Sequence, residues 1–230
     1  MVQIGGIQKF STIDYPGHTA AAIFLIGCNM RCGYCHNPEL VLPEQYIGAI
    51  PEQEILDFLK TRVGLLDGVA VSGGEPTMNE DLPEFLRKIK HMGFLVKLDT
   101  NGTHPKMLRD MLDEGLLDFV AMDIKGPIDK YTEIAARPID TDAIQECIDL
   151  IRERVDHEFR TTIVRSQLEP HDFEAIGAMV KGAKRFALQH FVSSGNLVSG
   201  RFWDEQTFSD DEMKEAQTIM KKYVVECVVH

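Results

Sequence analysis

The sequence predicts an α/β fold in which a parallel sheet of six strands forms an open, partial barrel. Six short runs are apolar on nearly every residue, as buried parallel strands are. Amphipathic segments, with apolar residues three or four positions apart, alternate with these runs. The alternation implies right-handed crossovers around a parallel sheet, and six strands are too few for the usual eight-stranded closure.

Each element has its own segment of the chain. The expected strands are 19–26, 68–71, 94–98, 119–124, 159–164 and 186–192. The expected helices carry the apolar stripes at 55–63, 82–92, 107–112, 144–155, 173–180 and 213–223. No linker, repeat or low-complexity tract interrupts this pattern, so we expect one domain over residues 1–230. Function is expected in the loops that follow the carboxyl ends of the strands.

Composition excludes several classes of protein. Apolar residues make up 44% of the 230 residues and charged residues 26%, which indicates a globular chain. The 36 acidic and 24 basic residues give a net charge of -12, so we expect neither nucleic acid nor a membrane surface as a partner. The chain shows neither a signal-peptide pattern nor a long apolar span, and we expect a cytoplasmic protein.

Three cysteines gather in the loop after the first expected strand. Cys28, Cys32 and Cys35 have the spacing CxxxCxxC. Three thiolates can hold three irons of a [4Fe-4S] cluster and leave the fourth iron open to a cofactor or substrate. The alternatives at this point are a zinc ion held by the three cysteines with His36, or a reactive CxxC dithiol.

Polar clusters also follow the next three expected strands. Residues 72–76 read Ser-Gly-Gly-Glu-Pro, in which the glycines allow close backbone approach and Glu75 offers an acceptor for an ammonium group. Residues 99–102 read Asp-Thr-Asn-Gly. Asp123 and Lys125 share one face of the fourth strand because they are two residues apart. Each cluster alone is typical of an ordinary strand end, but together they indicate a site.

The cysteine loop, with Tyr34 before its last cysteine, and the Gly-Gly-Glu-Pro turn at 73–76 resemble the radical S-adenosylmethionine superfamily. Further segments resemble its glycyl-radical-enzyme activases, most of all the anaerobic ribonucleoside-triphosphate reductase activating proteins, with the pyruvate formate-lyase activating enzymes as neighbours. These segments are 6–17, 35–39, 98–102 and 122–125.

This resemblance implies a partial (β/α)6 TIM-like barrel with a [4Fe-4S] cluster on Cys28, Cys32 and Cys35. The open iron would chelate S-adenosylmethionine. Its reductive cleavage would give a 5'-deoxyadenosyl radical that takes the α-hydrogen of a glycine in a large partner, an anaerobic ribonucleotide reductase. The electron would come from a flavodoxin- or ferredoxin-type donor.

The resemblance also implies roles for single residues. Glu75 and the two glycines before it would hold the methionyl ammonium, Tyr34 would lie beside the adenine, and Asp123 and Lys125 would contact the ribose and the carboxylate. The cofactor-binding residues are then Tyr34, Gly73, Gly74, Glu75, Asp99, Thr100, Asp123 and Lys125. A monovalent-cation site beside the carboxylate would use Asp99, Thr100, Met122 and Asp123.

Other residues with metal-binding or catalytic potential are expected to be structural. Cys147 and Cys227 lie in apolar stretches and should be packed in the core, so a second cluster is not expected. Arg160 and His190 match no substrate contact, and we expect structural roles for both.

Two other functions remain open on the sequence. The same chemistry could act on another glycyl radical enzyme, of the pyruvate formate-lyase type, or on a different substrate, because the shared motifs bind the cofactor. A zinc-binding interaction module would use Cys28, Cys32, Cys35 and His36 but leaves the strand-end clusters unexplained.

Overall fold

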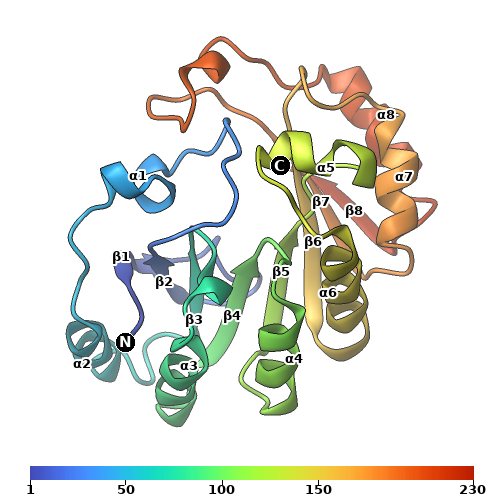
Figure 1. Ribbon diagram of the computed structural model, residues 1–230. Helices are drawn as coiled ribbons and strands as arrows, with labels where there is room; N and C mark the ends of the chain where they lie inside the picture. The colour runs from blue at the N-terminus through green and yellow to red at the C-terminus, as the bar shows by residue number, and fades with distance from the viewer. The chain divides into compact units, whose positions relative to one another are not determined.

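The computed structural model describes all residues 1–230 and has the predicted α/β alternation with a largely parallel sheet (Figure 1). Its strands follow the chain in the order β1 to β8. There are therefore eight strands rather than the expected six. The additional strands are β1 (Ile4–Ser11), which is antiparallel to β2, and β8 (Glu226–Val229), which is parallel to β7.

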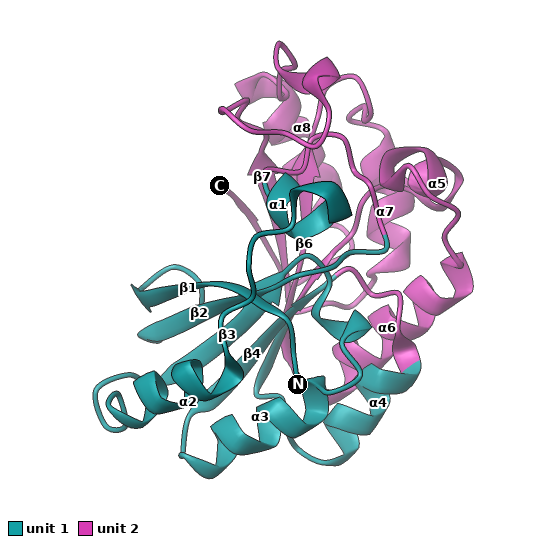
Figure 2. Cartoon of the chain, turned by 60° about the vertical axis from the view of Figure 1, so that its left-hand side comes forward, with its two compact units in different colours: residues 1–29, 37–100, 106–120 teal, residues 30–36, 101–105, 121–230 magenta.

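The chain divides into two compact units that interleave along the sequence (Figure 2). Unit 1 comprises residues 1–29, 37–100 and 106–120. Unit 2 comprises residues 30–36, 101–105 and 121–230. The boundary at residue 30 falls inside the cysteine loop, and β5 (Phe119–Asp123) begins in unit 1 and ends in unit 2. The expectation of a single domain stays a prediction.

Unit 1 is a four-stranded sheet with helices along it (Figure 2). Its strands are β1, β2 (Ala20–Leu25), β3 (Gly68–Gly73) and β4 (Leu95–Thr100). Its helical segments are α1 (Pro38–Val41), η1 (Pro43–Gln45), α2 (Glu52–Lys60), η2 (Pro76–Met78), α3 (Leu82–His91) and, but for its first residue, α4 (Pro105–Asp113). The strands β2, β3 and β4 are parallel, so their carboxyl ends meet at one edge.

Unit 2 carries the second parallel part of the sheet. Its elements after β5 are α5 (Ile128–Ala135), α6 (Thr141–Arg154), β6 (Asp156–Ile163), α7 (Asp172–Met179), β7 (Arg185–His190), η3 (Gly200–Phe202), α8 (Asp210–Met220) and β8. The strands β6, β7 and β8 are parallel. Fully buried aromatic rings fill the core: Tyr131, Phe159, Phe173 and Phe186.

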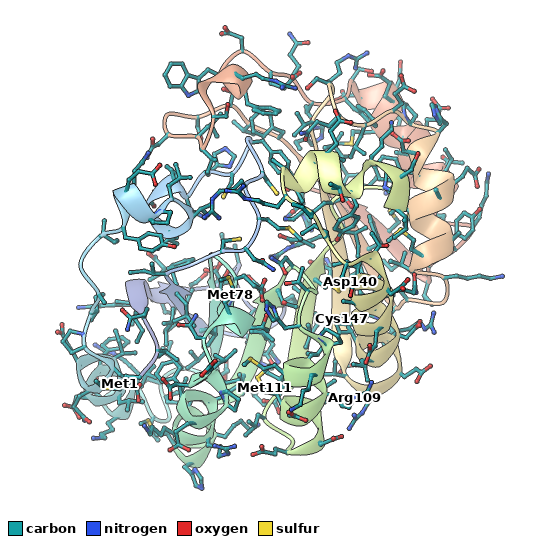
Figure 3. The ribbon with its side chains drawn as sticks, in the orientation of Figure 1. Met1, Met78, Arg109, Met111, Asp140 and Cys147 are labelled. Carbon is teal, nitrogen blue, oxygen red and sulfur yellow. The ribbon has the colours of Figure 1, made fainter.

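Local sequence explains where the main helices of unit 2 begin. The side chain of Asp140 accepts hydrogen bonds from the first backbone N–H groups of α6. Ser209 and Glu212 form a capping box at the start of α8. Cys147 lies on the buried side of α6 (Figure 3), and Cys227 is buried on β8, so both thiols are packed in the core as expected. No helix has the length and apolar character needed to cross a membrane.

Candidate functional site

The turn after β3 is built on two glycines that side chains could not replace. Gly73 has φ +126°, and a Cβ there would lie 2.3 Å from the backbone N and O of Leu25. A Cβ on Gly74 would lie 2.0 Å from the carbonyl oxygen of Gly27. The N–H of Gly74 donates to Leu25 O at 2.9 Å. The glycines therefore let the end of β3 lie directly against the end of β2.

Glu75 is buried and held in one orientation by neutral donors. Its backbone N–H donates to Gly27 O at 2.7 Å, next to Cys28 in the chain. Its Oε1 accepts hydrogen bonds from the backbone N–H of Thr77 at 3.1 Å, from the Thr77 hydroxyl, and from the Thr100 hydroxyl at 2.8 Å. These bonds tie the turn to the start of the cysteine loop and orient the carboxylate of Glu75.

Asp99 has a partner that sequence reasoning missed. The ammonium of Lys97 forms an ion pair with the Asp99 carboxylate, and only 4% of the lysine side chain is exposed. The two residues share one face of β4 because they are two positions apart. The signal was present in the sequence, since Lys97 is the one charged residue inside the expected strand at 94–98.

The cysteine loop crosses the boundary between the units, with Cys28 in unit 1 and Cys32 and Cys35 in unit 2. None of the five cysteines of the chain forms a disulfide bond. Burial raises the pKa of the Cys32 thiol, and the nearby Lys125 ammonium opposes that rise. Three thiols on one loop form the soft donor set that an iron–sulfur cluster requires, and cluster binding would deprotonate them. The residues present therefore fit a three-cysteine cluster.

Backbone hydrogen bonds hold the unit 2 part of this loop in place. The N–H of Cys35 donates to Cys32 O at 3.1 Å. The N–H of Val198 donates to Cys35 O at 3.0 Å, and that of Ser199 to Gly33 O at 2.9 Å. The two residues before η3 therefore hold this part of the loop through backbone hydrogen bonds.

His36 has a different partner from the one that the zinc alternative requires. Its Nε2 lies 2.8 Å from Val192 O, and its ring packs against Phe191. A zinc site that uses His36 Nε2 would have to break this contact with Val192 O.

Tyr34 lies in an aromatic group within unit 2. Its ring makes edge-on contacts with Phe191 and Phe202, with centroid distances of 6.3 Å in each case. Burial raises the pKa of Tyr34 well above its usual value, so the phenol stays neutral. A Cβ on Gly33 would lie 2.3 Å from the Phe202 ring, so the residue before Tyr34 must be small. The place of Tyr34 beside adenine stays a prediction.

Asp123, at the end of β5, pairs with two cations. Lys125 Nζ lies 3.0 Å from Asp123 Oδ2, and the guanidinium of Arg160 on β6 donates to Asp123 Oδ1. Burial alone would raise the pKa of Asp123, but Arg160 and Lys125 together hold it far below its usual value. Burial opposes the charge of Lys125 too, yet Asp123 raises the pKa of the lysine well above normal. All three groups are therefore ionised.

The structure thus gathers the predicted residues into two sets and adds one residue to each. Unit 1 holds Cys28, Gly73, Gly74, Glu75, Asp99 and Thr100, to which it adds Lys97. Unit 2 holds Cys32, Tyr34, Cys35, Asp123 and Lys125, to which it adds Arg160. His190 is half-buried at the end of β7, where its backbone N–H donates to His230 O at 2.8 Å.

Comparison with known proteins identifies the family of this chain. The chain is 37% identical, over 98% of its length and 95% of the other chain, to a protein of Methanocaldococcus jannaschii named as a candidate glycyl-radical enzyme activating enzyme. It is 29% identical to the pyruvate formate-lyase-activating enzyme of Listeria monocytogenes over 54% of this chain and 53% of that one.

Among solved structures, Streptococcus suis SuiB bound to S-adenosylmethionine has a TM-score of 0.69 at 13% identity. The match covers 89% of this chain and about half, 48%, of SuiB, and it shows a shared fold. The model of the radical SAM superfamily matches residues 23–178, which include the cysteine loop and every strand-end cluster described above. The chain belongs to the radical SAM superfamily.

Proposed function

We propose that this protein is a glycyl-radical-enzyme activating enzyme whose target is an anaerobic ribonucleoside-triphosphate reductase. The observation that carries the activase assignment is the near full-length similarity, at 37% identity, to a protein named for that activity. The choice of target is supported by the segments 6–17, 35–39, 98–102 and 122–125, which are most like the activating proteins of that reductase.

The superfamily uses a [4Fe-4S] cluster and S-adenosylmethionine. Cys28, Cys32 and Cys35 would hold the cluster. A cluster held there would supply, once reduced, the electron for cleavage of S-adenosylmethionine to methionine and a 5'-deoxyadenosyl radical, and that radical would take the α-hydrogen of a glycine in the partner. A flavodoxin- or ferredoxin-type protein would deliver that electron. The task of this chain is to bind and orient the cluster and S-adenosylmethionine and to exclude water from the site.

The charges in the two sets of residues suit the methionyl part of the cofactor. In unit 1, Glu75 is fixed by neutral donors and can accept an ammonium. In unit 2, Lys125 and Arg160 both form ion pairs with Asp123, and ammonium and guanidinium groups of this kind can also bind a ligand carboxylate. The set in unit 1 would suit the ammonium of an amino-acid zwitterion, and the set in unit 2 would suit its carboxylate.

The first experiment tests the chemistry. The purified protein is reconstituted anaerobically with iron and sulfide, reduced with dithionite, and assayed for 5'-deoxyadenosine after addition of S-adenosylmethionine. We expect a brown protein with about four irons per chain and formation of the product. A colourless protein that holds zinc and forms no product would refute the proposal.

The second experiment tests the target. The reduced protein and S-adenosylmethionine are mixed with a candidate partner, and the glycyl radical is measured by electron paramagnetic resonance. We expect a glycyl radical on an anaerobic ribonucleotide reductase, with a pyruvate formate-lyase as the matched comparison. A radical on the lyase alone would keep the activase assignment and overturn the target.

A further inference from the structure

Lys97 is a buried cation that the predicted site did not include. Its side chain is 4% exposed and lies in the parallel part of unit 1. In the sheet register Lys97 lies opposite Ala70 of β3, and Ala70 lies opposite Ala22 of β2. Residues opposite one another in a sheet place their side chains on the same face. Two alanines beside Lys97 therefore leave space for its long side chain.

The buried ammonium is paired with one carboxylate. Lys97 Nζ contacts Asp99 Oδ1, and the Asp99 side chain is itself only 14% exposed. A buried ammonium without a counter-charge is strongly unfavourable, so the pair is retained as a unit. The ammonium of Lys97 thus provides Asp99 with a counter-charge that belongs to the protein itself.

The two carboxylates of the expected monovalent-cation site, Asp99 and Asp123, each have a cationic partner within their own unit. Asp99 is paired with Lys97, and the hydroxyl of Thr100 donates to Glu75. Within unit 2, Asp123 is paired with both Lys125 and Arg160. A Na⁺ or K⁺ ion would have to compete with ammonium and guanidinium groups that are covalently fixed. The side chains present therefore do not fit a metal cation.

We propose that Lys97 replaces the monovalent cation, so that this site binds S-adenosylmethionine without Na⁺ or K⁺. Lys97 is then a positioning residue: its ammonium holds the Asp99 carboxylate at the end of β4. This inference rests on the proposed function, because it concerns the same cofactor site. At Asp99, the unit 1 carboxylate of the expected cation site, it replaces a bound metal cation with the ammonium of Lys97.

The test compares S-adenosylmethionine affinity in two salts. The cluster-loaded protein is titrated anaerobically in tetramethylammonium chloride and in sodium or potassium chloride at equal ionic strength. We expect the wild-type dissociation constant to differ by less than about two-fold between the salts. In Lys97→Met the Asp99 carboxylate loses the ammonium of Lys97, and we expect affinity about tenfold weaker in tetramethylammonium and largely regained with Na⁺ or K⁺.

Two further variants control for structure. Lys97→Arg keeps the charge and should stay independent of Na⁺ and K⁺. Lys90→Met breaks the ion pair of Lys90 with Asp118, elsewhere in unit 1, and should show no salt-specific change in affinity. The thermal unfolding midpoint of each protein, measured without S-adenosylmethionine, gives a second readout. Only Lys97→Met should be stabilised by Na⁺ or K⁺ relative to tetramethylammonium.

A wild-type protein that binds S-adenosylmethionine about tenfold more tightly with Na⁺ or K⁺ would overturn the inference and leave the proposed function intact. The comparison of wild-type affinity in the two salts tests the inference even if Lys97→Met does not fold. A wild-type protein that binds no S-adenosylmethionine in either salt would overturn the proposed function, and this inference with it.

Discussion

The two sets of site residues solve the problem of buried charge in different ways. In unit 1, Glu75 receives hydrogen bonds from a backbone N–H and two hydroxyls, and Asp99 forms an ion pair with Lys97. The bonds to Glu75 fix the carboxylate without cancelling its charge. Unit 1 therefore presents an oriented acceptor.

Unit 2 has the opposite balance. There the single carboxylate of Asp123 is shared by Lys125 and Arg160. Attraction to both cations outweighs the effect of burial on the pKa of Asp123. This difference indicates that the set in unit 1 is suited to binding a cation and the set in unit 2 to binding an anion. An amino-acid zwitterion such as the methionyl group needs both.

The largest effect is expected at the cysteine loop, because the proposed reaction requires the cluster that this loop would hold. Cys32→Ala removes one of three cluster ligands, so we expect iron content to fall from about four per chain to near zero and 5'-deoxyadenosine formation to be lost. Iron analysis and the product assay check this. Cys147→Ser is the matched control, because Cys147 is buried in α6 and should leave both readouts unchanged. Product formation by Cys32→Ala would contradict the proposed cluster.

Removing the acceptor of unit 1 should have the next largest effect. Glu75→Ala should retain iron but weaken S-adenosylmethionine binding by about 2–4 kcal/mol, because a buried ammonium would lose a charged acceptor. Calorimetric titration of the cluster-loaded protein measures this. Glu75→Gln keeps an oxygen for the bonds from Thr77 and Thr100 but removes the charge, and it separates the two roles. Normal affinity in Glu75→Gln would assign Glu75 to the turn alone.

A smaller effect is expected when one of the two cations in unit 2 is removed. Arg160→Gln leaves Asp123 paired with Lys125 but removes the guanidinium that could bind the ligand's carboxylate, so we expect S-adenosylmethionine to bind more weakly by about 1.5–3 kcal/mol. The ligand without its carboxylate, decarboxylated S-adenosylmethionine, should bind equally to the variant and the wild type. A double-mutant cycle over protein and ligand measures the coupling. Zero coupling would place the carboxylate away from Arg160.

Much of the fold could be predicted because apolar runs and amphipathic stripes follow the periods of strand and helix. The expected strand at 119–124 is β5 at Phe119–Asp123, and the expected helix at 82–92 is α3 at Leu82–His91. The strand β1 was missed because it contains two glycines and its Gln8, Lys9 and Phe10 are exposed, so it has no apolar run. The four residues of β8 are too few for periodicity to distinguish.

The sequence could predict those candidate site residues that lie directly at the ends of strands. Glu75, Asp99 and Asp123 follow apolar runs, and parallel strands bring their carboxyl ends to one edge. Lys97 and Arg160 lie inside strands, and their roles depend on what each charged side chain meets when the chain has folded. Spacing does not encode such pairing, so Arg160 was assigned a structural role and Lys97 was overlooked.

The smallest effect is expected when a buried side chain of unit 2 away from the site, His157, is replaced. His157 Nδ1 lies 2.8 Å from Val155 O, and its Nε2 accepts the N–H of Lys184 at 3.1 Å, which requires a neutral ring. Burial lowers the pKa of His157 below its usual 6.5. The unfolded chain therefore binds the proton more readily, and stability should be full above about pH 6.5 and decrease as the pH falls below it. His157→Gln should lower the free energy of unfolding by about 1 kcal/mol at pH 8 and less at pH 5, as measured by urea unfolding of the wild type and variant in parallel. An equal loss at both values would mean that His157 does not titrate with folding, and that acid sensitivity resides elsewhere.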